Sequence, residues 1–137
     1  MSSDLLTPEN LSKDVLKSMY DAAYMETSFD DDGDLRVEEG GIRCFVMPSD
    51  DGDRIQLLSL FGADSNARRE DLLEFANRVN AGIIIIRVSI RGNGGIAFDY
   101  DIPVRGGITK QAVVLATKRF LAIPIPAIRQ YGSDLVQ

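Results

Sequence analysis

Apolar residues recur along the first part of the chain at spacings that predict one helix followed by strands. Those between residues 11 and 22 fall on one stripe at helical spacing, which predicts a helix over residues 8–24 with Thr7 as its N-cap. Over residues 25–61 the period changes to two, which indicates strands. Three strands with alternate apolar residues, separated by turns rich in Asp and Gly, predict an antiparallel meander.

The middle of the chain predicts a second helix followed by a β-hairpin. The helix covers residues 65–82, with Ser65 as its N-cap and Gly82 in a left-handed conformation at its end. Two strands of matched length, at 84–90 and 96–102, flank a Gly-Asn-Gly turn. This pattern is typical of a hairpin whose alternate apolar residues face a core.

The last part of the chain predicts a helix that ends at prolines. Thr109 is its expected N-cap. Pro124 and Pro126 are expected to break or kink it, because proline removes a helical hydrogen bond and clashes with the preceding turn. A short helix over residues 127–131 follows.

Together these elements predict one small α+β domain over residues 1–137. The order α-β-β-β-α-β-β-α suggests two layers, with one antiparallel sheet and helices packed on it. The core is expected at about residues 8–131, and the tail at 132–137 is expected to be loose.

The second face of the predicted sheet has a mixed character. A sheet with one face in water carries mostly polar residues on that face. Here several positions are instead apolar: Phe45, Met47, Leu58, Leu60, Ile83 and Ile85. If they are exposed, these six form a patch that marks a protein-binding surface, either for a partner or for a second copy in a homodimer. The alternative is that a helix or loop of the same chain covers them.

Charge and composition narrow the function classes. The formal net charge of -6 over 137 residues argues against a nucleic-acid partner, which would select a basic surface. The sequence contains no histidine, which removes the commonest general base and metal ligand. Since Ser-His-Asp and Cys-His systems are thereby excluded, we expect neither an enzyme nor a bound cofactor.

The sequence also suggests a compartment. No apolar run approaches the roughly 20 residues of a membrane span, and the first residues lack the features of a signal peptide. The single cysteine, Cys44, agrees with a reducing environment. We therefore expect a cytoplasmic protein without a membrane partner. Because Cys44 lies in phase with Ile42 and Val46, we interpret it as a small buried hydrophobe.

Two segments invite an ion-binding hypothesis. The acidic run at residues 30–34 lies in a partial calcium-loop template. The template positions are occupied by Ser28, Asp30, Asp32, Gly33, Leu35 and Glu39. Its first position should be Asp and its flanks should be helices, so a solvated hairpin turn is the alternative. Gly106 and Gly107 precede the helix at Thr109 and could hold an anion, or simply form a loop and cap.

Asp99 and Asp101 could in principle do acid/base work, because they share one strand face. No nucleophile or cofactor motif accompanies them, and we interpret them as a solvated strand face.

Several short motifs carry a family resemblance. They are Asn77-Arg78-Val79-Asn80, Asp99-Tyr100-Asp101-Ile102, Gly106-Gly107-Ile108-Thr109 before a helix containing Phe120, and Asp32-Gly33-Asp34 in the first hairpin. In this combination the chain resembles the YbjN family of small bacterial proteins, which are described as sensory transduction regulators. The resemblance covers roughly residues 11–129.

The resemblance implies a fold similar to that of the class I type III secretion chaperones. Those chaperones are small, acidic, cytoplasmic and dimeric, and they bind an unfolded segment of a secreted protein on apolar surface. Neither group implies catalytic residues. The leading hypothesis is a non-enzymatic, YbjN-like regulator that acts by protein–protein contact as a homodimer. The alternatives are a secretion-chaperone-like protein with a client and a calcium or anion sensor.

Overall fold

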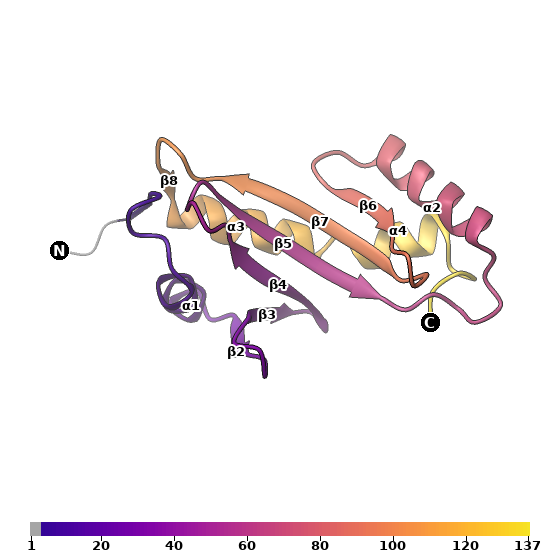
Figure 1. The fold of residues 1–137 in the computed structure, drawn as a ribbon, viewed down its shortest axis with the longest axis horizontal. Coiled ribbons are helices and arrows are strands. Elements are labelled where there is room, and N and C mark those ends of the chain that lie inside the picture. Colours follow the sequence, from indigo (N-terminus) through magenta and orange to yellow (C-terminus); the bar gives the residue numbers. More distant parts are fainter. Residues whose placement is uncertain (1–3) are drawn as a thin grey trace.

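The computed structural model describes residues 4–137, which form two antiparallel sheets and four helices (Figure 1). The elements in chain order are β1 (Leu5–Leu6), α1 (Lys13–Ala22), β2 (Glu26–Phe29), β3 (Leu35–Glu39), β4 (Ile42–Pro48), β5 (Arg54–Phe61), α2 (Arg69–Gly82), β6 (Arg87–Ile90), β7 (Ile96–Pro103), β8 (Ile108–Thr109), α3 (Lys110–Leu121) and α4 (Pro124–Tyr131). The larger sheet has the strand order β2-β3-β4-β5-β7-β6, and β1 pairs with β8 in a small second sheet.

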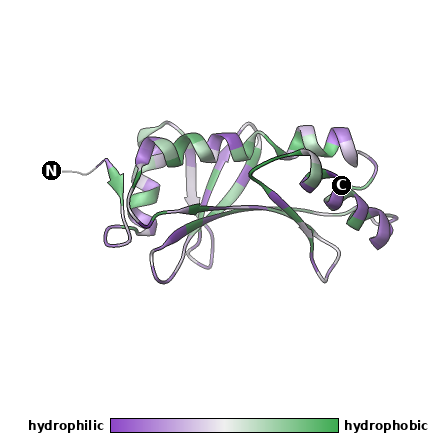
Figure 2. Ribbon diagram, turned by 90° about the horizontal axis from the view of Figure 1, so that it is seen from above, coloured by the Kyte–Doolittle hydropathy of each residue, from purple (hydrophilic) through white to green (hydrophobic). Residues whose placement is uncertain are grey.

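One face of the larger sheet, the inner face, carries the core. The long helix α3 runs along this side (Figure 2), and α2 adds Phe75, whose ring centroid lies 6.5 Å from that of Phe98 on β7. Alternate strand residues on the inner face are buried: Leu35, Val37, Cys44, Val46, Ile55, Leu57, Ile96, Phe98 and Ile102. The predicted alternation of the strands and the predicted α+β fold class are therefore confirmed.

Three strands of the structure, β1, β2 and β8, were not predicted. β2 forms a fourth meander strand, which pairs with β3 from Glu26↔Glu38 to Phe29↔Leu35. The small β1–β8 sheet was not predicted, because two-residue strands leave no periodic pattern. The expectation of one single sheet is thus corrected to a six-stranded sheet with a two-stranded one beside it.

Two helix starts lie later than predicted. The first helix begins at Lys13, where Ser12 is the N-cap and its hydroxyl accepts a hydrogen bond from the Val15 amide at 3.1 Å. Thr7 instead opens a turn, in which its amide donates to the Asn10 side chain at 2.8 Å. The second helix begins at Arg69, and Ser65 lies outside it in a turn. Thr109 does cap α3, since its hydroxyl accepts from the Ala112 amide at 3.0 Å.

The predicted strand at 84–90 is half as long as expected. α2 continues through Gly82, which is helical rather than left-handed. A Cβ on Gly82 would lie 2.5 Å from the Tyr131 hydroxyl, so this glycine permits close packing of α2 on α4. Ile85 has a φ of 82°, which interrupts the alternation, and β6 begins only at Arg87. Ile84, predicted to face the core, is 72% exposed.

The C-terminal part of the chain consists of two helices, α3 and α4, and a short tail that contacts the rest of the fold. As predicted, the chain breaks at the prolines, with α3 ending at Leu121 and Pro124 opening α4. The predicted loose tail is wrong, because the Asp64 amide donates to the Leu135 carbonyl at 2.7 Å and Val136 bridges to Ala63.

Among residues 4–137, the stretch Lys110–Tyr131 is long and apolar enough to cross a membrane by length and composition alone. This corrects the expectation that no segment approaches that length. Within the fold this stretch forms α3 and α4, and Val113, Phe120 and Ala127 of these helices are buried in the common core.

A buried hydroxyl pair joins α1 to α3. Thr117 Oγ1 donates to the Val113 carbonyl at 2.8 Å, and Tyr20 Oη lies 2.7 Å from Thr117 Oγ1. A threonine hydroxyl has one proton, so Tyr20 donates to Thr117. Both side chains are fully buried, and burial raises the pKa of the Tyr20 hydroxyl, which stays protonated.

We expect Thr117→Val to lower the free energy of unfolding by about 1–3 kcal/mol, because it leaves the Tyr20 hydroxyl buried without an acceptor. Tyr20→Phe combined with Thr117→Val should cost less than Thr117→Val alone, since no orphaned donor remains. Urea unfolding of the four proteins of this double-mutant cycle measures both values. A double variant less stable than Thr117→Val would contradict the assignment.

Candidate functional site

The face of the larger sheet opposite the helices, the outer face, carries an apolar strip across its two longest meander strands. Phe45 pairs with Leu58, and Leu60 pairs with Ala97. With Met47, these residues lie outside the core cluster and outside the hydrophobic residues packed against it. Leu60 is 47% exposed, and Phe45, Met47 and Leu58 are half-buried. Four of the six predicted contact residues therefore share one accessible face, as the alternation predicted.

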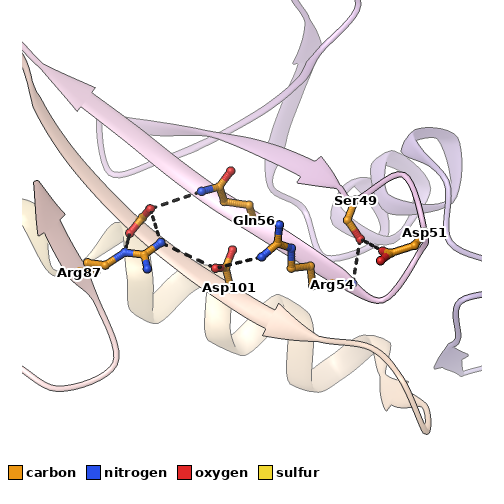
Figure 3. A network of polar contacts seen from close by, with 7 residues as sticks. Ser49, Asp51, Arg54, Gln56, Arg87 and Asp101 are labelled. Carbon is orange, nitrogen blue, oxygen red and sulfur yellow. Dashed lines mark hydrogen bonds and ion pairs between the residues drawn. The ribbon is translucent and has the colours of Figure 1, made fainter. Parts of the chain in front are cut away.

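Beside the apolar strip, an ion-pair network covers the outer face of β5, β6 and β7 (Figure 3). The Arg87 guanidinium donates two hydrogen bonds to the Asp99 carboxylate, both at 2.9 Å, and Gln56 donates to the same carboxylate at 3.3 Å. Asp101 lies 3.8 Å from Arg87 and 3.9 Å from Arg54. The hydrogen bonds from Arg87 to Asp99 raise the pKa of the arginine further.

This network corrects the interpretation of Asp99 and Asp101 as solvated carboxylates. The Asp99 side chain is only 13% exposed, and its two oxygens are held by Arg87 and Gln56. The signal was present in the sequence, since the hairpin register places Arg87 directly opposite Asp99. The ion pair between Arg87 and Asp99 therefore joins β6 to β7.

Two buried polar atoms on the strands of this sheet lack a hydrogen-bond partner within the described residues. They are Asp101 Oδ1 on β7 and Arg36 Nε on β3. Arg36 pairs with Phe45 across β3 and β4, next to the apolar strip. Because both atoms are buried, a molecule bound on the outer face would reach neither of them without a rearrangement of the side chains.

The structure places Ile83 and Ile85 elsewhere. Because α2 runs to Gly82 and Ile85 is left-handed, these residues leave the alternating phase of the sheet. Ile83 packs against the core. Ile85 lines a hollow of about 260 Å³ on the helix side. The other lining residues are Tyr100, Leu115, Ala116, Arg119, Phe120 and Ile123.

Asn80, in the Asn-x-x-Asn motif, binds the edge strand β6. Its side-chain amide accepts from the Val88 amide at 2.8 Å and donates to the Val88 carbonyl at 3.0 Å. The side chain thus imitates a neighbouring strand at the edge of the sheet. Asn77 is exposed, and its side chain makes no hydrogen bond to the described part of the chain.

The acidic run at residues 30–34 forms the β2–β3 hairpin turn. One oxygen of Asp30 accepts hydrogen bonds from the amides of Asp32 and Asp34, at 3.0 and 2.8 Å. Asp34 also lies 3.5 Å from the Lys13 ammonium. Over residues 4–137, no group of three or more acidic, cysteine or histidine residues is gathered as a metal site. The paired strands on both sides and the hydrogen bonds within the turn support the hairpin interpretation.

The helix start at Thr109 is already satisfied by the chain itself. The Lys110 amide donates to the Asp4 carbonyl at 2.7 Å, and the Ala112 amide donates to Thr109. Gly106 and Gly107 have φ values of 88° and 89° and form a tight turn. These contacts favour the loop-and-cap interpretation over an anion site.

Cys44 is 1% exposed, and burial raises the pKa of its thiol to about 12. The thiol is therefore un-ionised at neutral pH, and the interpretation of Cys44 as a small buried hydrophobe is confirmed.

Comparison with known proteins gives one family and several solved structures of similar fold. A model of the YbjN family, described as "Putative bacterial sensory transduction regulator", matches residues 12–123. The crystal structure of YbjN, "a putative transcription regulator from E. coli", superposes with a TM-score of 0.74 at 13% identity, covering 93% of this chain and 96% of that one.

The second similar structure is a chain of the HopA1-SchA chaperone–effector complex. Its TM-score is 0.55 at 19% identity, covering 87% of this chain and 91% of that one. These identities establish a likeness of fold. No curated protein matches the chain.

We expect Asn80→Ala to lower the free energy of unfolding by about 1–3 kcal/mol, because it leaves the amide and carbonyl of the buried Val88 without partners. Asn77→Ala is the matched control, from the same motif and helix, and should change stability by less than about 0.5 kcal/mol. Urea unfolding measures both, and amide hydrogen exchange at Val88 should accelerate only in Asn80→Ala. Equal effects of the two substitutions would refute the role of Asn80.

Proposed function

The chain belongs to the YbjN family, and from that premise we propose that it is a non-enzymatic cytoplasmic protein that acts by protein–protein contact through the outer face of its sheet. The contact residues are Phe45, Met47, Leu58 and Leu60. We propose in addition that the working unit is a homodimer. The single observation that carries the proposal is the apolar strip that lies on the accessible outer face, outside the core.

The charge distribution of the outer face supports an oriented contact. The fixed Arg87–Asp99 pair lies on one side of the strip, and Arg36 lies on the other. An apolar centre with a polar rim is the usual anatomy of a protein interface.

A second candidate function is that of a secretion-chaperone-like protein that holds an unfolded segment of a client. The observation that favours it is the likeness of fold to a chain of a chaperone–effector complex. The two candidates differ in stoichiometry. A chaperone should retain one client at a fixed ratio, whereas a regulator should exchange its partners.

We expect Leu60→Asp to abolish capture of partner proteins by the tagged chain in its native host, because it places a charge within the apolar strip. The matched control is Leu73→Asp on α2, since Leu60 and Leu73 are similarly exposed, at 47% and 48%. Affinity purification with quantitative mass spectrometry compares both variants with the wild type.

Loss of the same companions from both variants, or from neither, would count against the outer face as the contact surface. A single companion at constant ratio, lost only with Leu60→Asp, would favour the chaperone candidate over the regulator.

A further inference from the structure

The hollow on the helix side of the molecule combines an apolar lining with one positive charge. Its volume is about 260 Å³. The apolar residues of the lining are Ile85, Leu115, Ala116, Phe120 and Ile123. The lining is completed by Tyr100 and Arg119, and we call the whole the helix-side hollow. It is separate from the outer face, because Tyr100 alternates on β7 with Asp99 and Asp101.

The walls of the helix-side hollow are apolar and yet exposed to water. Leu115 is 57% exposed and Ile85 is 42% exposed, so a molecule that fills the hollow would remove apolar surface from water. Ile85 also has a φ of 82°, a conformation that β-branched residues rarely adopt. Backbone strain beside exposed apolar walls is expected where a bound molecule compensates for both.

The charge at the helix-side hollow favours an anion. Arg119 is exposed, and its side chain forms no ion pair or hydrogen bond within residues 4–137. Residues 110–129 contain no acidic residue, although the chain has a formal net charge of -6. Four other hollows of the described chain each have at least one acidic lining residue, whereas this one has none. An unpaired arginine beside an apolar hollow can hold a carboxylate with two parallel hydrogen bonds.

The size of the helix-side hollow limits the apolar part of such an anion. Pockets for drug-sized ligands have volumes of roughly 300–1,000 Å³, and this hollow is smaller. A single unbranched hydrocarbon chain therefore fits it better than a two-chain lipid or a large ring system. The hydroxyl of Tyr100, which forms no hydrogen bond within the described residues, is a second donor in the lining.

A second copy of the chain and a bilayer surface match the hollow less well. A two-fold contact here would bring residues 110–129 of both copies together, and the charged residues in that segment are all basic. A bilayer would cover the projecting side chain of Ile84, which is 72% exposed, but its flat surface would leave the hollow unfilled.

We propose that the helix-side hollow binds a small amphipathic carboxylate of the medium-chain fatty-acid type. The hydrocarbon chain lies against Leu115 and Ile85, and the carboxylate binds Arg119. Burial of the chain supplies most of the affinity, and the arginine selects for the negative charge. This goes beyond the proposed function, because it adds a ligand site on the side of the sheet opposite the outer face.

The first test locates the site by nuclear magnetic resonance. Octanoate, kept below its micelle-forming concentration, is titrated into the isotope-labelled full chain. The amide signals of Ile85, Leu115 and Ala116 should shift and saturate at one octanoate per chain, whereas that of Leu60 on the outer face should not move. Octan-1-ol has the same chain length without the charge and should bind at least ~5-fold more weakly. Absence of saturable shifts on the helix side, or equal affinities for the two compounds, would overturn the proposal.

The second test uses two matched pairs of variants. Arg119→Gln should raise the dissociation constant for octanoate at least ~5-fold, because it removes the charge-assisted hydrogen bonds. Arg129→Gln removes an exposed arginine of α4 outside the lining and should leave the constant unchanged. Ala116→Leu should raise it at least ~10-fold by filling the hollow, and Ala112→Leu, earlier on α3 and outside the lining, is its control. Equal effects within either pair would contradict the assigned site.

The other occupants of the hollow predict different results. A second copy would make the same amide signals shift on dilution in the absence of octanoate. A membrane surface would make the chain float with phosphatidylglycerol vesicles, and Ile84→Glu would abolish that flotation. Either result, obtained without a saturable effect of octanoate, would overturn the proposal. Because Leu60 lies on the opposite side of the sheet, the outer face and the helix-side hollow can each fail their tests independently.

Discussion

The pairing of β5 with β7 is the constraint on which the rest of the structure depends. It joins strands more than 30 residues apart in sequence over eight residue pairs, from Arg54↔Pro103 to Phe61↔Ile96. Because side chains alternate between the two faces, a slip of one residue would turn Phe98 and Ile102 outward and bring Asp99 and Asp101 into the core. The correct register fixes at once which residues pack under α3 and which remain on the outer face. On the other side of β7, the ion pair between Arg87 and Asp99 stabilises the register of β7 against the neighbouring strand β6.

Sequence reasoning located the parts of this fold where one local pattern decides the outcome. The alternation along β3, β4, β5 and β7, the cap at Thr109 and the break at Pro124 were all recovered. It failed where two patterns compete. A run of four isoleucines fits a strand in either phase, and nothing in it shows that Ile85 takes a left-handed conformation or that the strand begins only at Arg87. Those two facts moved Ile83 and Ile85 from the outer face to the helix side.

For the polar residues too, the sequence predicted the position along the strand or helix but not every partner. Asp99 and Asp101 were assigned to solvent because strand periodicity records only which face a residue occupies. The hairpin register sets Arg87 opposite Asp99, whereas the partners of Asp101 lie on β5 and β6 and depend on the folded arrangement. Asn80 was singled out as part of a motif, but its pairing with Val88 depends on how α2 meets the sheet. Sequence periodicity therefore predicts layers well, whereas contacts across elements require the folded arrangement.

The two edges of the larger sheet are unequal, and this limits how the molecule can assemble. At β6 the side chain of Asn80 stands in for a neighbouring strand, while in the described part of the chain no strand lies beyond β2 at the other edge. Open-ended stacking of sheets into a fibre needs two receptive edges on every subunit. A molecule with one receptive edge can join a second through it and then has none left. The side chain of a single asparagine thus disfavours edge-to-edge growth of this protein through β6, because it occupies both backbone groups of Val88.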